Sequence, residues 1–381
     1  MEKACGLDVH KDSVFACILD EQGKKILEKR YGTLTPDLTT LRDTLVSHGC
    51  GSIAMESTSI YWMPIWHVLE SDFSLKLANP YFIHQLPGRK SDVKDAHWIA
   101  ECLQKDLIKG SFVPEGVLQE MRQFSRQCFR LTKSLVRIEQ QLDNQLQRCN
   151  IRLSNYVSNQ GNNVSLRKVI GAIIQGERDP YKLVRLVHGR IKNKHGHQVI
   201  AASMEGVINP TDIEMLKGCM EQINLFEKQQ AACLNHLEEL ADAYFAGEIS
   251  LLCTIPGIQK YSAMCILSEI GNDMSAFGKA SHLVGWAGLR PRNDESAGKI
   301  QSRKTLHGNK YLRKMLVQVS LSASRSNKTF LGKKYNQFSK RMISQKATPA
   351  ITRKILVIIF NVLQTGRPFD AQRNLQAVKP D

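Results

Sequence analysis

The first 105 residues alternate between short apolar runs and amphipathic segments, and this order limits the possible fold more than any other feature. The runs 4–9, 13–19 and 24–31 predict three antiparallel strands, with a turn at 20–23 (Asp-Glu-Gln-Gly). Residues 36–48 predict a helix with Leu38, Leu41 and Leu45 on one face. A strand (52–56), a helix (61–70), a strand (74–78) and a helix (92–104) are expected to follow. This order predicts a mixed α/β sheet.

The middle of the chain has a different pattern, with two apolar seams typical of long paired helices. The first seam steps by four, three, four and four residues through Leu131, Leu135, Ile138, Leu142 and Leu146. The second is weaker and consists of Leu216, Met220, Ile223, Gln230, Leu237 and Leu240. We expect these helices to pair with each other or with another subunit. Residues 154–209 lie between them and have the polar composition of an insertion or a partly mobile segment.

Basic residues are concentrated in the last quarter of the chain. Residues 290–381 hold 20 Lys and Arg against four acids, a net charge of +16, which equals the charge of the whole chain. Residues 1–289 are therefore neutral overall. A basic segment beside a neutral body indicates a polyanionic partner, most commonly nucleic acid. A solvated, solubilising surface is the alternative.

Other sequence features argue against several classes of protein. No run of about 18 apolar residues occurs, so we expect no membrane span and no membrane partner. The N-terminus lacks the charged start and long apolar core of a secretory signal. The ten cysteines include no Cys-x-x-Cys pair, which argues against a zinc site or a disulfide framework. We therefore expect a cytoplasmic protein.

Four carboxylates occupy positions from which they can gather. Asp8 lies at the centre of the first predicted strand, an unusual place for an acid, and Glu56 ends the fourth. Asp92 and Asp95 are three residues apart at a helix start and share a face. Taken singly, such acids are commonly solvated or complement a helix dipole. If the first and fourth strands are neighbours, however, the four repel one another, and a pair of Mg²⁺ ions about 4 Å apart would relieve that repulsion and clamp a phosphate.

Two features of the C-terminal region indicate phosphate binding. Residues 255–258 (Ile-Pro-Gly-Ile) are typical of a helix-hairpin-helix element, whose turn at Gly257 would present backbone N–H groups; an ordinary loop is the alternative. Residues 286–299 predict a polar loop in which Ser296 can approach a phosphate or serve as a turn residue. The basic side chains expected to contact phosphate are Arg290, Arg292, Lys299, Arg303, Lys304, Lys310, Arg313 and Lys314.

Together these segments resemble the DEDD transposases of the Piv/MooV and insertion-sequence 110 type, the bridge recombinases. The similar N-terminal stretches are 6–11 (Gly-Leu-Asp-Val-His-Lys), 55–58 (Met-Glu-Ser-Thr) with Tyr61, and 91–96 (Ser-Asp-Val-Lys-Asp-Ala). The C-terminal ones are 255–258, 286–289 (Trp-Ala-Gly-Leu) with Pro291 and Arg292, and 295–296 (Glu-Ser). The resemblance covers roughly residues 4–105 and 250–370.

The resemblance implies three domains. These are an RNase H-like (RuvC-like) catalytic domain over 1–110, a helical coiled-coil linker over 111–247 with an insertion near 154–209, and a mainly helical, DNA-binding transposase domain over 248–381. It places a Mg²⁺-binding tetrad on Asp8, Glu56, Asp92 and Asp95 and a nucleophile on Ser296, which would form a covalent phosphoserine link to DNA. It further implies double-stranded DNA and a structured guide RNA as partners. Because strand exchange joins two duplexes, we also expect a dimer or tetramer.

Two other functions stay open at this point. A RuvC-like nuclease that uses the carboxylates and water would keep the tetrad but give Ser296 no role. A non-enzymatic DNA-binding protein built on the helix-hairpin-helix element would give neither the four carboxylates nor Ser296 a role. A covalent protein–DNA adduct would separate the recombinase from both alternatives.

Overall fold

The computed structural model describes residues 2–83, 95–157, 163–291, 294–296, 299–302, 305 and 307–371. The chain folds as two compact units, unit 1 over residues 1–113 and unit 2 over residues 114–381.

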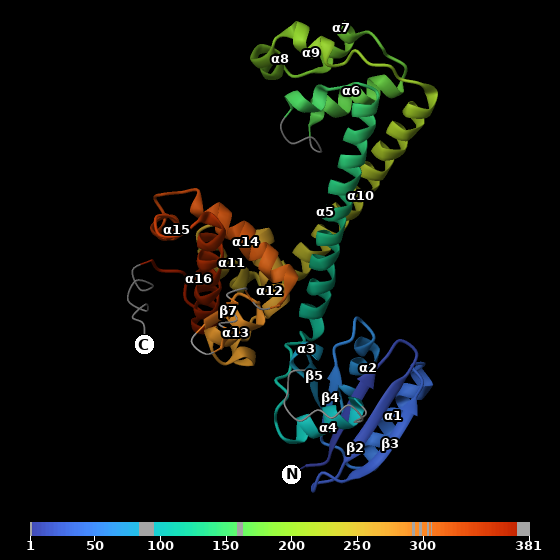
Figure 1. Cartoon of the computed structure of the whole chain (residues 1–381), viewed down its shortest axis with the longest axis vertical. Helices are drawn as coiled ribbons and strands as arrows, with labels where there is room; N and C mark the ends of the chain where they lie inside the picture. The colour runs from blue at the N-terminus through green and yellow to red at the C-terminus, as the bar shows by residue number, and fades with distance from the viewer. Residues whose placement is uncertain are drawn as a thin grey trace. The chain divides into compact units, whose positions relative to one another are not determined.

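Unit 1 is built on a five-stranded sheet with the order β3-β2-β1-β4-β5 (Figure 1). Strands β1, β2 and β3 are antiparallel, whereas β4 runs parallel to β1 and β5 runs parallel to β4. The strands are β1 (Ala4–Val9), β2 (Val14–Leu19), β3 (Lys25–Tyr31), β4 (Ser52–Glu56) and β5 (Ser74–Ala78). The mixed sheet predicted from the sequence is thus confirmed, and its arrangement is RNase H-like.

Helices cover both faces of this sheet. The helices of unit 1 are α1 (Thr35–Ser47), α2 (Trp62–Leu69), α3 (Pro80–Ile83) and α4 (Asp95–Gln104). One core cluster joins Leu41 of α1 and Ile65 of α2 to Leu7 and Met55 of the sheet. Two further clusters join α4 to the opposite face of the sheet. The predicted helix start at Asp92 lies outside the described residues.

Unit 2 begins with two long antiparallel helices, α5 (Gly116–Arg148) and α10 (Pro210–Tyr244), which lie side by side (Figure 1). All five leucine and isoleucine positions of the first seam are buried. In the second seam Leu216, Ile223 and Leu237 are buried, while the other three positions are half-buried. Since the helices pack on each other within one chain, contacts between subunits would need other surfaces.

The segment that connects α5 to α10 forms a group of short helices at one end of this pair (Figure 1). We call the described residues from 153 to 204 the helical cap. Its elements are η1 (Leu153–Tyr156), α6 (Val164–Ile174), α7 (Pro180–Leu183), η3 (Val184–Leu186), α8 (Gly189–His195) and α9 (His197–Ala202). The sequence indicated an insertion or a partly mobile segment. In the described part of this stretch, Val169 and Ile173 share a core cluster with Leu142 and Leu146 of α5. The elements of the cap are too short to show a long apolar repeat, so periodicity did not reveal them.

The rest of unit 2 is mainly helical, as predicted. Its elements are α11 (Ala246–Cys253), α12 (Lys260–Ile270), η4 (Met274–Phe277), α13 (Ala280–Trp286), β6 (Asp294–Ser296), β7 (Lys299–Ser302), α14 (Lys310–Ser324), α15 (Phe330–Ser339) and α16 (Ser344–Thr365). The predicted polar loop around Ser296 contains a short antiparallel strand pair in which Ser296 pairs with Lys299.

Among the described residues, one helix is long and apolar enough to cross a membrane by length and composition alone. It is the Gln345–Thr365 part of α16, and half of that stretch is buried inside the chain. Ile351, Ile355 and Ile359 are fully buried, and α16 packs against α13, α14 and α15. The core helix of a globular domain has the same properties.

Candidate active site

Asp8 and Glu56 occupy adjacent strand ends in unit 1. Leu7 of β1 pairs with Met55 of β4, and Asp8 and Glu56 are the next residues of these two strands. Neighbouring strands in a sheet lie about 4.8 Å apart. Asp8 is the second-last residue of β1, not a central one as the sequence suggested. Leu7 and Met55 face the α1 and α2 side of the sheet. Because successive strand residues alternate faces, Asp8 and Glu56 both project toward the face that α4 covers.

Helix α4 packs very closely on β1, and a glycine permits this. A Cβ atom at Gly6 would lie 2.2 Å from the backbone oxygen of Ala96, so no larger residue fits there. Asp95 is the first residue of α4 and directly precedes this contact. The close approach of α4 to β1 therefore brings a third acid toward Asp8.

The electrostatics of Asp8 reflect this neighbourhood. Its side chain is only 16% exposed, and burial is the main cause that raises its pKa. The charge of His10 lowers that pKa, while the charge of Asp95 raises it. His10 Nε2 lies 3.1 Å from Asp8 Oδ2. The sequence alone assigned His10 no role, although its place two residues after Asp8 in the Gly-Leu-Asp-Val-His-Lys stretch was a usable signal.

The structure thus brings three of the four predicted carboxylates to one face of the sheet, and Asp92 lies outside the described residues. Their donors are carboxylate oxygens, the ligands that Mg²⁺ prefers, and the repulsion between Asp8 and Asp95 is of the kind a cation relieves. Among the described residues, no group of three or more His, Cys, Asp or Glu side chains is placed so that it could hold a metal ion. The donor set fits Mg²⁺ in its chemistry.

Ser296 lies in unit 2, on a segment that leaves the helical core through a narrow neck. A Cβ atom at Gly308 would lie 2.2 Å from the backbone nitrogen of Gly288. The two ends of the segment therefore make backbone contact here, and we call this contact between Gly288 and Gly308 the neck. Pro291 and Thr305 form a β-bridge just beyond this crossing. Only the backbone of Ser296 is described, as the last residue of β6.

Arg313 and Asn309 secure this neck to the rest of unit 2. Arg313 donates from Nη2 to Thr305 Oγ1 over 2.9 Å and from Nη1 to the Gly288 carbonyl over 3.4 Å. Asn309 caps α14, since its Oδ1 accepts from the backbone N–H groups of Tyr311 and Leu312.

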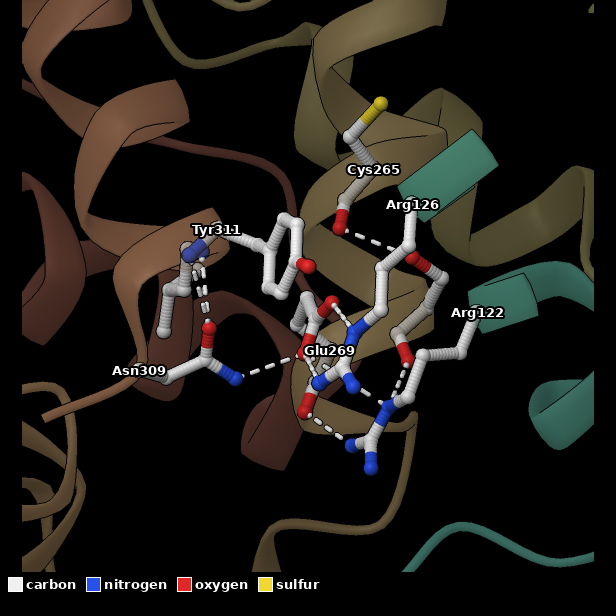
Figure 2. A network of polar contacts seen from close by, with 8 residues as sticks. Arg122, Arg126, Cys265, Glu269, Asn309 and Tyr311 are labelled. Carbon is white, nitrogen blue, oxygen red and sulfur yellow. Dashed lines mark hydrogen bonds and ion pairs between the residues drawn. The ribbon is translucent and has the colours of Figure 1, made fainter. Parts of the chain in front are cut away.

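A buried carboxylate anchors Asn309 in turn (Figure 2). Glu269 of α12 is 1% exposed and accepts a 2.6 Å hydrogen bond from Asn309 Nδ2. Arg126 of α5 donates to both Glu269 oxygens, and Arg122 donates to the backbone carbonyls of Ser268 and Glu269. The base of the serine-bearing segment is therefore tied through one carboxylate to α5 and α12.

No prediction from the sequence included this network. Its one available signal was Glu269 itself, the one charged residue in the run 263–270, whose other residues except Ser268 are apolar. A carboxylate on such a helix requires cationic or hydrogen-bonding partners. The cationic partner, Arg126, comes from a position more than 140 residues away in α5, which no local pattern identifies.

The predicted basic residues differ in exposure and in how far the structure describes them. Arg290, Lys310 and Lys314 are exposed, whereas Arg313 is half-buried and engaged with the neck. Lys314 also lies 4.7 Å from the centre of the Phe129 ring. Lys299 is described only by its backbone in β7. The remaining three, Arg292, Arg303 and Lys304, lie outside the described residues.

Gly257 lies in the turn between α11 and α12 with φ at +93°, a region that favours glycine. A Cβ atom there would lie 2.8 Å from Ala323 Cβ and 2.8 Å from the Val319 carbonyl oxygen of α14. The packing of this turn on α14 is thus a sufficient reason for glycine at this position, independent of any phosphate contact.

Comparisons with known proteins match transposase families to a stretch in each unit. The family model for DEDD transposases of the IS110 type, described as "Transposase", matches residues 5–151. A second model, "Transposase IS116/IS110/IS902 family", matches residues 249–336. The first match contains Asp8, Glu56 and Asp95, and the second contains Ser296 and Glu269.

Two curated relatives are similar over a shorter stretch. The pilin gene-inverting proteins of Moraxella bovis and Moraxella lacunata are each 37% identical over 128 residues, which is 32% of this chain and 38% of each relative. The chain thus matches well under half the length of these relatives. The two family models nevertheless together span more than half of the 381 residues, in the expected order. The chain belongs to the IS110 family of DEDD transposases.

Proposed function

We propose that this chain is a DNA transposase or site-specific recombinase that cuts and rejoins double-stranded DNA through a covalent phosphoserine intermediate. The observation that carries the proposal is that Asp8, Glu56 and Asp95 lie toward one face of an RNase H-like sheet. The family membership supports DNA as the substrate, since its members catalyse phosphoryl transfer on DNA.

The carboxylates supply the electrostatic part of the reaction. Asp8, Glu56 and Asp95, with Asp92, would hold two Mg²⁺ ions, which when bound offset the charge of the phosphate and polarise its oxygens. His10 keeps Asp8 in position through its 3.1 Å contact. The raised pKa of Asp8 makes its ionised form less favourable without a cation, and this favours cation uptake.

Ser296 supplies the nucleophile in this proposal. Its Oγ forms a bond to phosphorus, the bond from phosphorus to one deoxyribose oxygen breaks, the hydroxyl proton passes to a base or solvent, and the leaving oxygen takes up a proton. The new phosphodiester keeps the energy needed for rejoining. The neck formed by Gly288, Gly308 and Arg313 holds the base of the serine-bearing segment in place.

The basic last quarter of the chain, which belongs to unit 2, would bind the nucleic acid backbone. As partners we propose the two DNA duplexes and a structured guide RNA, within a homodimer or homotetramer acting on chromosomal DNA in the cytoplasm. Recombination that is lost after ribonuclease treatment of the purified complex would support the RNA; undiminished recombination would remove it from the proposal.

The decisive experiment tests for a protein–DNA adduct. The chain is incubated with end-labelled element DNA, its associated RNA and Mg²⁺, denatured, and separated by gel electrophoresis before and after protease. We expect a protease-sensitive adduct from the wild type and from Ser322→Ala, an exposed serine of α14. Ser296→Ala should form none. Cleavage by Ser296→Ala at the normal rate would replace the recombinase with a nuclease that uses water.

A further inference from the structure

A second basic surface exists on the helical cap, outside the basic last quarter. Residues 180–204 contain no Asp or Glu, although residues 1–289 as a whole carry no net charge. The same 25 residues hold five permanent cations and three histidines. The cations are Lys182, Arg185, Arg190, Lys192 and Lys194.

These cations belong to a folded surface. Leu183, Val187 and Ile200, which alternate with them in sequence, are buried in the core cluster shared with α5 and α6. On the outer side, Arg185, Arg190 and Lys194 are exposed and Lys192 is half-buried, beside the exposed apolar side chains of Tyr181, Leu186 and Val199. The folded cap therefore buries one set of apolar residues in the core and leaves these cations at its surface.

Four of the five cations are available for a partner. Lys182 forms an ion pair with Glu177 over 3.5 Å. Across the part of the chain that the structure describes, Arg185, Arg190, Lys192 and Lys194 form no ion pair with an acid. Arg190 and Lys194 are four residues apart on α8 and thus adjacent on one helical face.

The cap is distant from the basic residues around α14. Arg126 of α5 contacts α12, and Leu146 of the same helix packs on the cap. Twenty helical residues separate these two positions, which corresponds to about 30 Å at 1.5 Å per residue. A phosphate backbone bound near α14 would need to extend over roughly that length to reach the cap.

We propose that the helical cap is a second binding surface for the phosphate backbone of duplex nucleic acid. Clustered Arg and Lys without interspersed acids suit a dense, regular polyanion, and such side chains position a duplex without reading its sequence. The proposal rests on the proposed function only in that the chain acts on nucleic acid, and the serine chemistry has no part in it. The duplex is either DNA or folded RNA, which share this backbone chemistry.

The experiment measures the salt dependence of binding for the full-length chain. The cap variant combines Arg185→Gln, Arg190→Gln, Lys192→Gln and Lys194→Gln. The control variant removes the same charge elsewhere by changing the exposed residues Lys24, Lys109, Lys217 and Lys228 to Gln. Fluorescence anisotropy with a 40-base-pair DNA duplex and, separately, an RNA duplex of the same length gives the slope of log affinity against log salt. Equal thermal midpoints for all variants confirm that they are folded.

We expect the cap variant to lower this slope by about 0.9 for each phosphate that it no longer neutralises, up to about 3.6 for four phosphates, while the control lowers the slope by less than about 0.9. A decrease with DNA alone or RNA alone identifies the duplex. Equal slopes for wild type and cap variant on both probes would overturn the proposal. A third variant changes Lys310 and Lys314 to Gln. If this variant loses binding while the cap variant binds like the wild type, the proposed function stands and only the proposal for the cap is overturned.

Discussion

Arg126 and Glu269 form an ion pair with two hydrogen bonds, Nε to Oε1 at 2.8 Å and Nη2 to Oε2 at 2.9 Å, which joins α5 to α12. Glu269 is 1% exposed and Arg126 is 33% exposed. Burial acts to lower the pKa of Arg126, but the hydrogen bonds and charge of Glu269 outweigh it and the pKa is raised. Burial lowers the pKa of the neighbouring Arg122 to about 10. One carboxylate therefore compensates two partly buried guanidinium groups.

Replacing Glu269 by Gln should destabilise unit 2 strongly, because both arginines would lose their counter-charge. Breaking a buried pair from one side costs about 3 to 5 kcal/mol, and the partial exposure of Arg126 places the expected loss near 3 kcal/mol. Thermal unfolding measures it. Glu221→Gln, an exposed glutamate of α10, should change the midpoint little. Similar midpoints for the two variants would show that the network contributes little to stability.

Asp8→Asn should have opposite effects on the metal-free and metal-bound protein. The pKa of Asp8 is raised in the folded state by burial, so its charge opposes folding at neutral pH, and the variant should melt at a higher temperature in EDTA. The wild type should then gain stability on addition of Mg²⁺, whereas the variant should gain much less. Asp12→Asn, an exposed neighbour, serves as the control. An equal Mg²⁺ response in wild type and Asp8→Asn would contradict the metal assignment.

Gly257→Ala should destabilise the packing of the α11–α12 turn on α14. Alanine at φ +93° costs about 1 to 2 kcal/mol, and its Cβ would overlap Ala323 and Val319, which adds to that cost. Gly247→Ala in α11 has open space around its Cβ position and should leave stability unchanged or slightly raised. Denaturant unfolding compares the two. A neutral Gly257→Ala would mean that the turn relaxes away from α14.

Arg313 and Lys314 should differ although they are adjacent in a basic helix. Arg313 holds Thr305 and the Gly288 carbonyl, so Arg313→Gln should cost about 1 to 3 kcal/mol of stability. Lys314 is exposed, so Lys314→Gln should preserve stability and lower the salt slope of DNA binding by about 0.9. Melting curves and anisotropy separate the two effects. An unchanged slope for Lys314→Gln would mean that this side chain faces solvent in the complex.

Mixing two inactive variants tests whether the active site is built from two subunits. Asp8 belongs to unit 1 and Ser296 to unit 2. A mixture of Asp8→Asn and Ser296→Ala proteins retains one intact carboxylate set and one intact serine in different chains. Recovery of some adduct, which we expect, would support assembly in trans. No recovery, while each variant alone still binds DNA, would favour a site within one chain.

Much of the local structure was predictable because its residues act through short-range rules. The alternation of apolar residues located all five strands of unit 1 to within one residue at each end. The leucine positions of α1 and the first seam of α5 are buried as expected. The helical cap and the strand pair at Ser296 were not predicted, since their elements are short and derive their stability from tertiary contacts.

Local patterning and the order of motifs were sufficient for the class of sheet, the two long helices, and the identity of the candidate acids and serine. Tertiary packing decided how these residues relate. Gly6 allows α4 to approach β1 and bring Asp95 toward Asp8, while Glu269 binds both Arg126 and Asn309, which are far apart in the sequence of unit 2. Periodicity reports which side of an element is apolar, but it carries no information about which distant element will satisfy a buried charge or fill the space that a glycine leaves.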